Sequence, residues 1–257
     1  MCYLQGMAFP VVLLPGIVLP AELAYAALLA ELGDGVDAVA KDLELYAPDD
    51  VPADYSLDLD VAGVFREADA RGWDRVHLVG YSGGGAIVLM ATARHPDRVA
   101  SLALLEPAWA GRWDLSADES AMLEEYARIG ALPPEEFMSA FVRLALAPGV
   151  TPPPPAPGDP PAWMASRPAG IAAITRAFAT DELDRGALER FPRPVYFALG
   201  GLSNPRHYGE VARRLEGVFR DFELEVFVER HHFDPPHRIE PARLARSLKA
   251  LWARAEG

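Results

Sequence analysis

The most constraining feature of the sequence is a glycine-rich turn, Gly80-Tyr81-Ser82-Gly83-Gly84, that joins two regular elements. Residues 75–79 have the composition of a strand, and residues 86–94 have that of a helix. So sharp a change of direction needs Gly80 and Gly84, because any side chain there is expected to collide across the turn. We therefore expect a strained backbone at Ser82, whose hydroxyl points out of the sheet edge in front of the helix N-terminus.

Short apolar segments alternate with helical patterns along much of the chain. This alternation is typical of βαβ units and predicts an α/β fold, with a mostly parallel sheet flanked by helices. The further strands are expected at residues 11–14, 36–40, 99–105, 195–199 and 222–228. The further helices are expected at residues 21–32, 57–68, 205–219 and 241–253.

The alternating pattern stops in the middle of the chain. Residues 1–108 and 191–257 carry it and are expected to form one α/β core domain, whereas 109–190 shows only helical patterns and is expected to be an inserted helical cap. Within the insertion, residues 148–161 contain eight prolines. Since proline lacks the backbone donor of a helix, we expect this segment to be exposed and mobile.

Composition excludes several classes of protein. The chain has 257 residues, 51% of them hydrophobic, and can bury a large core. A net charge of −13 disfavours nucleic acid and anionic membranes as partners. The chain contains no apolar run long enough to span a membrane, and no Lys or Arg precedes the apolar stretch near its start. We therefore expect a cytoplasmic protein; a homodimer remains open.

Four short motifs give the chain a resemblance to a known family. They are the turn around Ser82, the Leu14-Pro15-Gly16 turn, the strand end Leu104-Leu105-Glu106-Pro107 and the late pair His232-Phe233. Together they resemble the α/β-hydrolase fold family, in particular its esterase-like serine hydrolases with a helical cap insertion. The resemblance implies that Ser82 is a nucleophile, which needs an adjacent base because a free serine hydroxyl reacts poorly.

The base is expected in the loop after the last strand, where the family places it. His231, His232 and His237 lie there, and His232, followed by Phe233, resembles the family pattern best. His231 remains the alternative. His77 lies within a strand and is expected in the core, and His207 is expected on the surface.

The acid is expected at an unusual position. Most of the family place it after the strand preceding the last one, but residues 199–205 contain no carboxylate. Glu106 ends an apolar strand next to that of Ser82, where a carboxylate is costly to bury unless it is paired. The resemblance to members with the acid at this second place favours Glu106. Other candidates remain Asp234, Asp181 and Asp184.

Two backbone N–H groups should hold the oxyanion. The family pattern assigns them to Gly83 and Ile17, although Pro15-Gly16 stands where the family commonly has His-Gly. Tyr81, Trp109 and Trp113 are candidate substrate contacts. No cofactor or metal is expected, because the His231-to-His237 loop contains Pro235-Pro236 and lacks the rigid ligand spacing of zinc sites.

The sequence therefore predicts a serine hydrolase that cleaves a small ester, thioester or lactone. Ser82, His232 and Glu106 would form a catalytic triad and the reaction would pass through an acyl-enzyme. One alternative is a non-hydrolytic small-molecule binding or sensor protein on the same fold. Another is a lyase or transferase that keeps Ser82 or His232 but uses an acceptor other than water.

Overall fold

A six-stranded parallel sheet forms the centre of the protein in a computed structural model that describes residues 9–46, 51–130, 132–152, 154 and 158–257. Its order is β2-β1-β3-β4-β5-β6, so the chain crosses to opposite sides of β1 when it forms β2 and β3. Such a switch point opens a crevice at the carboxyl ends of the strands, where ligands bind. The strands are β1 (Phe9–Leu14), β2 (Val36–Ala40), β3 (Val76–Tyr81), β4 (Val99–Leu105), β5 (Val195–Gly200) and β6 (Phe222–Phe227).

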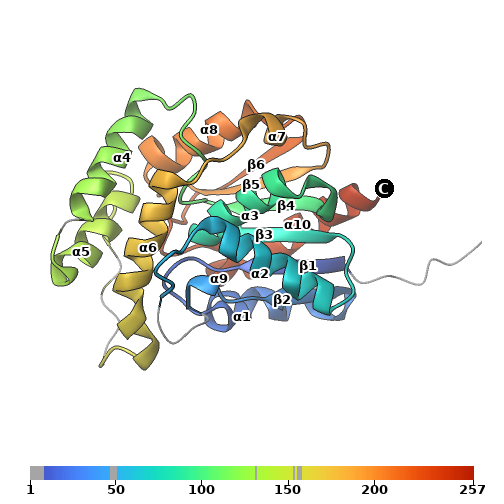
Figure 1. Ribbon diagram of the computed structural model, residues 1–257, viewed down its shortest axis with the longest axis horizontal. Helices are drawn as coiled ribbons and strands as arrows, with labels where there is room; N and C mark the ends of the chain where they lie inside the picture. Colours follow the sequence, from blue (N-terminus) through green and yellow to red (C-terminus); the bar gives the residue numbers. More distant parts are fainter. Residues whose placement is uncertain (1–8, 47–50, 131, 153, 155–157) are drawn as a thin grey trace, which may run out of the picture.

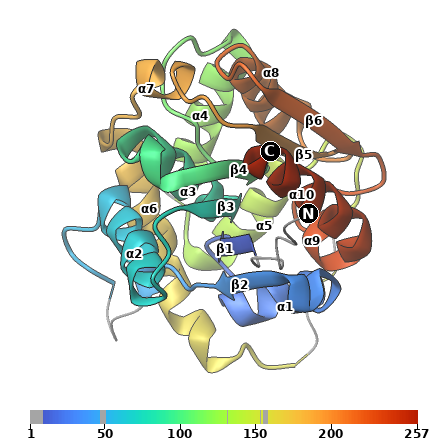
Figure 2. The ribbon, with the colours of Figure 1, turned by 90° about the vertical axis from the view of Figure 1, so that its right-hand side faces the viewer.

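Both faces of the sheet are covered by helices, because successive strand side chains point to opposite faces. Val11 and Leu13 of β1 pack in one core with helices α1 and α10, whereas Val12 and Leu14 pack in the other with α2, α3 and α8. Figure 2 shows α1 and α10 on one side of the sheet and α2 and α3 on the other. These helices are α1 (Ala21–Leu32), α2 (Leu57–Ala70), α3 (Gly83–Arg94), α8 (Glu210–Glu216) and α10 (Pro241–Glu256).

The chain between β4 and β5 forms a group of helices beside the sheet. They are α4 (Ala117–Ile129), α5 (Pro134–Ala145), a 3₁₀ turn η4 (Ala162–Ser166), α6 (Arg167–Thr180) and α7 (Arg185–Glu189). Figure 1 shows α4, α5 and α6 together on one side of the molecule, next to the strands. The division into a core domain and a cap domain at residues 109 and 190 stays a prediction.

Several local details differ from the sequence expectations. The expected helix over 205–219 is a π-helical turn, η5 (Pro205–Gly209), followed by the shorter α8, and a short helix α9 (Pro236–Ile239) interrupts the expected loop. Four residues of the proline-rich segment, at 153 and 155–157, lie outside the described residues; Pro148, Pro152 and Pro154 are exposed. The mobility of this segment stays a prediction. None of the helices in the described ranges combines the length and apolar character that a membrane crossing requires.

Candidate active site

The turn after β3 holds Ser82 in a conformation that side chains rarely adopt. Its backbone angles are φ 53° and ψ −115°, in the positive-φ region that costs a non-glycine residue free energy. A Cβ atom at Gly80 would lie 2.4 Å from the carbonyl oxygen of Gly84, so that glycine is required across the turn, as expected. At Gly84 the reason is different: a Cβ atom would lie 2.4 Å from the carbonyl oxygens of Leu14 and Pro15. The second glycine therefore lets the elbow sit against the end of β1.

Ser82, His232 and Glu106 form a buried chain of hydrogen bonds. Ser82 Oγ lies 3.1 Å from His232 Nε2, and His232 Nδ1 lies 3.1 Å from Glu106 Oε2. The three side chains are almost fully buried, at 4%, 2% and 3% exposure. The residues come from the elbow, the loop after β6 and the end of β4, which the parallel sheet brings to one edge. The arrangement can pass a proton from the serine hydroxyl to an imidazole that a carboxylate orients.

Glu106 is held from two sides. Its Oε2 faces His232, and its Oε1 accepts a hydrogen bond from Gly200 N–H at 2.8 Å. Gly200 ends β5, which neighbours β4. The strand end that in most of the family supplies the acid thus supplies a backbone donor here, which satisfies the second oxygen of Glu106.

The other candidate acids are engaged elsewhere. Asp234 pairs with Arg230 at 2.6 Å, Asp181 accepts the N–H of Leu57 at 2.7 Å, and Asp184 caps α7. The structure therefore brings Glu106 to the imidazole and leaves these three carboxylates with other partners.

Two tyrosines fix the position of His232. The Tyr81 hydroxyl donates a hydrogen bond to the His232 carbonyl oxygen. The Tyr208 ring stacks on the imidazole, with ring centroids 4.4 Å apart and an angle of 16° between the planes. Sequence reasoning did not find Tyr208, because it lies in the π-helical turn η5 and no motif marks it.

The remaining histidines are not placed to act on Ser82. His237 is fully buried between the rings of Tyr25 and Tyr81, and burial lowers its pKa to about 3. His231 forms an isolated bridge with Asp234, and burial lowers its pKa as well.

One expectation about the histidines is wrong. His207 is buried rather than on the surface, at 5% exposure, because η5 turns it toward Tyr126 and Tyr208. Burial, with a smaller contribution from nearby His232, lowers the pKa of His207 to about 3. His77 is buried in β3 as expected. Within the described ranges, no cluster of three or more His, Cys, Asp or Glu side chains could hold a metal ion.

The two expected backbone donors flank the serine. Gly83 is the first residue of α3, where an N–H group has no acceptor in a preceding turn. A Cβ atom at Gly83 would lie 2.4 Å from Ile17 Cγ2, and one at Gly16 would lie 3.3 Å from Ser82 Cβ. The turn after β1 thus lies directly against the elbow. Among the described residues, the Ile17 N–H makes no hydrogen bond.

A mainly apolar cavity of about 220 Å³ opens beside Ser82. Its walls are formed by the turn after β1, helix α5 and the loop that carries His232. Of the described residues that line it, Arg238 alone is an Asp, Glu, Lys or Arg. Tyr81 lies in the wall, as expected. The apolar wall residues are Ile17, Val18, Leu19, Ala24, Met138, Phe141, Val142, Phe233 and Pro235.

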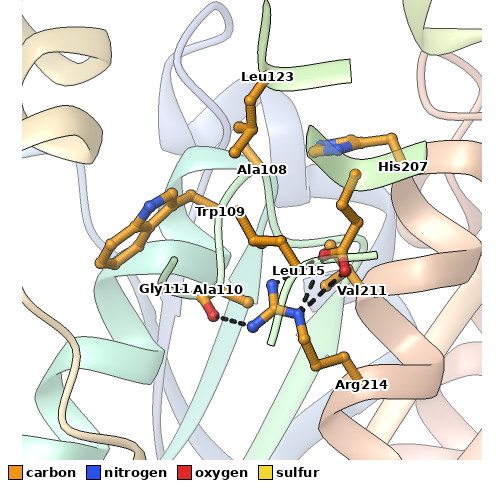
Figure 3. Close-up of a pocket in the computed structure, with 10 residues that line it drawn as sticks. Ala108, Trp109, Ala110, Gly111, Leu115, Leu123, His207, Val211 and Arg214 are labelled. Atoms are coloured by element: carbon orange, nitrogen blue, oxygen red, sulfur yellow. Dashed lines mark hydrogen bonds and ion pairs between the residues drawn. The ribbon is translucent and has the colours of Figure 1, made fainter. Parts of the chain in front are cut away.

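The structure does not bring Trp109 and Trp113 to this cavity. Trp109 is 3% exposed and stacks on Phe178, with ring centroids 5.6 Å apart, because it packs into the core beneath the helices. It lines a much smaller pocket, together with Arg214 (Figure 3). The guanidinium of Arg214 lies 4.4 Å from the ring centroid of Trp113 and forms a buried ion pair with Glu119. Neither tryptophan lines the cavity beside Ser82.

Comparisons with known proteins agree with this fold. Residues 10–149 match the family model of the alpha/beta hydrolase fold. Among solved structures, a thermophilic esterase from Thermogutta terrifontis has a TM-score of 0.69 at 17% identity, covering 98% of this chain and 92% of its own. A hydrolase from Pseudomonas aeruginosa has a TM-score of 0.67 at 19% identity, covering 96% and 91%. A meta-cleavage product hydrolase from Pseudomonas fluorescens has a TM-score of 0.65 at 17% identity, covering 97% and 92%.

No curated protein matches the sequence significantly. The family model nevertheless spans more than half of the chain. The solved structures mentioned above share the fold over almost the full length of this chain. The chain therefore belongs to the alpha/beta hydrolase fold family and is a hydrolase of that fold.

Proposed function

We propose that the protein is a serine hydrolase that cleaves small ester-type substrates, namely esters, thioesters or lactones, through an acyl-enzyme. The observation that carries the proposal is the pair of 3.1 Å contacts that link Ser82, His232 and Glu106 in one buried chain. A buried serine next to a carboxylate-oriented imidazole is the arrangement that activates a hydroxyl for attack on a carbonyl.

These positions support the following reaction. His232 Nε2 takes the proton of Ser82 as Oγ attacks the carbonyl carbon, and Glu106 stabilises the imidazolium. The N–H groups of Gly83 and Ile17 donate to the developing oxyanion. The imidazolium then protonates the leaving alcohol, thiol or ring oxygen, which leaves the acyl group on Ser82. A water molecule, deprotonated by Nε2, attacks the acyl carbon, and the proton returns to Ser82 as the acid departs.

The cavity limits the size of the bound group. An apolar cavity of about 150 Å³ holds one benzene molecule, so the 220 Å³ beside Ser82 holds about nine non-hydrogen atoms. Its wall residues from α5 and the turn after β1 are apolar. We therefore infer that a short aliphatic or single-ring group fills it and that long acyl chains bind poorly. Two structural neighbours, the esterase from Thermogutta terrifontis and a carboxylesterase from Bacillus subtilis, support an ester-type substrate.

Labelling with a fluorophosphonate, followed by peptide mass spectrometry, tests the proposal. We expect rapid, stoichiometric modification of Ser82 in the wild type and strong suppression in His232→Ala. His231→Ala is the matched control, because it removes the neighbouring imidazole and should leave the labelling rate nearly unchanged. A folded wild type that does not react would contradict the proposal and favour a non-hydrolytic binding protein. Equilibrium binding of short esters without turnover would then support that alternative.

A further inference from the structure

Two side chains from distant parts of the chain hold the turn that carries Ile17. The Tyr46 hydroxyl donates to the Ile17 carbonyl oxygen at 2.7 Å. The Arg167 Nε–H donates to the next carbonyl oxygen, that of Val18, also at 2.7 Å. Tyr46 ends a short 3₁₀ turn (Glu44–Tyr46) after β2, and Arg167 begins α6. The turn itself has no regular secondary structure, so these contacts fix two successive peptide groups from outside.

Tyr46 and Arg167 also form one packed unit. The guanidinium carbon of Arg167 lies 3.8 Å from the ring centroid of Tyr46 and 5.1 Å from that of Trp163. One turn further along α6, a Cβ atom at Gly170 would lie 2.3 Å from the Tyr46 ring, so helix and ring are in direct contact. The position of α6 therefore determines the position of the Tyr46 hydroxyl.

Arg167 is buried in an unusual way. It is only 5% exposed, and no carboxylate of the described residues lies within ion-pair distance of it. Burying an unpaired charge is costly, and a solvent-exposed arginine would avoid that cost. The compensating contacts of Arg167 are the Val18 carbonyl oxygen, the Ser166 hydroxyl and the two aromatic rings. Among the described residues, the contacts of Arg167 thus point to the turn beside Ser82 rather than to a carboxylate within ion-pair distance.

We propose that Tyr46 and Arg167 are positioning residues of the oxyanion hole, an inference that rests on the proposed function. Peptide groups are planar, so holding the carbonyl oxygens of Ile17 and Val18 fixes the planes of the 17–18 and 18–19 peptides, and the first of these planes contains the Ile17 Cα atom, to which the Ile17 nitrogen is bonded. On the other side, the Pro15 carbonyl oxygen accepts the Gly84 N–H at 3.0 Å, so the short stretch that carries the Ile17 N–H is held at both ends beside Ser82 before the substrate binds. Pro15-Gly16 lacks a side-chain donor that could hold this turn from within. Helix α6, in the segment between β4 and β5, therefore takes part in transition-state stabilisation, whereas α5 of the same segment lines the pocket.

Three variants separate positioning from packing. Tyr46→Phe removes one hydroxyl and keeps the ring. Arg167→Met removes the charge and the hydrogen bonds to Val18 and Ser166, whereas Arg167→Lys keeps a cation near Val18. Tyr196→Phe is the matched control, because its buried hydroxyl makes a similar hydrogen bond to Glu225 at 2.6 Å, near the start of β5.

The readouts are kcat and KM for a short p-nitrophenyl ester and the affinity for two ligands. Phenylboronic acid forms a tetrahedral adduct on an active serine and needs the oxyanion hole, whereas benzyl alcohol needs only the pocket. Removing an oxyanion donor outright costs about 10²–10³ in kcat, so misaiming one should cost about tenfold in Tyr46→Phe and more in Arg167→Met. Boronate affinity should weaken by the same factor, while KM and benzyl alcohol affinity stay within about twofold. Arg167→Lys should recover part of the loss.

The outcomes distinguish this proposal from the function on which it rests. A wild type that hydrolyses no ester and binds no boronate contradicts the proposed function. An active wild type with folded variants that keep wild-type kcat and boronate affinity overturns the positioning role. A rise in KM and loss of benzyl alcohol affinity at constant kcat overturns it as well, because it assigns these residues to the pocket. If Arg167→Met does not fold, Tyr46→Phe and Arg167→Lys carry the test alone.

Discussion

Replacing Glu106 with glutamine should disable the reaction while leaving the fold intact. The side chain keeps its shape, but one oxygen acceptor becomes an amide donor. In the native protein, Oε2 faces His232 Nδ1 at 3.1 Å and Oε1 accepts the Gly200 N–H at 2.8 Å. If the amide nitrogen faces His232, Nδ1 must accept and Nε2 carries the proton, so Nε2 cannot take the Ser82 proton. If it faces Gly200, two donors oppose each other in a buried site.

The structure allows both effects to be estimated. The wrong imidazole tautomer lowers kcat by about 10⁴ in serine hydrolases with the same arrangement, which is about 5 kcal/mol of transition-state stabilisation. An unsatisfied buried donor costs about 1–3 kcal/mol of stability, less than the total stability of a typical domain. The variant should therefore fold, with a lower midpoint of urea unfolding, and turn over an ester about 10⁴-fold more slowly.

The assay is steady-state hydrolysis of a short p-nitrophenyl ester, with circular dichroism and urea titration as the test of folding. Glu225→Gln is the matched control, because Glu225 also accepts several hydrogen bonds but lies on β6, where its partners are Tyr196, Ser247 and Arg243. It should keep wild-type kcat. A folded Glu106→Gln variant with more than about a tenth of wild-type kcat would refute the tautomer argument. It would also direct attention to Asp234.

Three further predictions follow from the same contacts. Gly80→Ala should destabilise the protein by about 1–3 kcal/mol and slow fluorophosphonate labelling, because its Cβ atom meets backbone; Gly35→Ala, with open space around it, should do neither. Burial lowers the His237 pKa to about 3, so between pH 6.5 and pH 5 the unfolded chain binds a proton at this position that the native protein does not. The contribution of His237 to the free energy of unfolding should therefore fall by about 2 kcal/mol over this range, and His237→Phe should reduce the pH dependence seen in urea titrations by that amount. Phe141→Ala opens the cavity wall and should shift kcat/KM toward longer acyl chains, whereas Phe178→Ala, outside the cavity, should leave chain-length preference unchanged.

Local patterns predicted most of the fold. Each strand and helix has a characteristic spacing of apolar residues and is bordered by residues that end it. The bounds of α1, β2 and β4 agree with the sequence expectations, and each of these segments is bordered by a glycine, proline or charged residue that ends it. The π-helical turn η5 and the short α9 were not predicted, because proline at the start of a segment is compatible with a helix, a turn or a loop. Tertiary contacts select among these local possibilities.

Pocket walls were the least predictable part of the site. Trp109 and Trp113 were candidates for contact with the substrate, yet Trp109 is packed into the core, whereas Phe141 lines the cavity. A tryptophan and a phenylalanine carry no signal that separates the core from a cavity wall, since both gain free energy by leaving water in either place.

The elbow could be predicted from the chain alone, because the contact that requires Gly80, with the Gly84 carbonyl oxygen, lies within four residues; the contact that requires Gly84, with the end of β1, depends on the fold. The sequence also limited the candidate bases to one loop and showed that residues 199–205, where most of the family place the acid, contain no carboxylate. Which of these groups meet depends on how the whole chain folds. His232 lies 150 residues from Ser82 and 126 from Glu106, and the parallel order β3-β4-β5-β6 brings them to one edge. The contacts of Tyr46 and Arg167 with the Ile17 turn likewise depend on where α6 packs, which no local pattern encodes because packing is a property of both surfaces together.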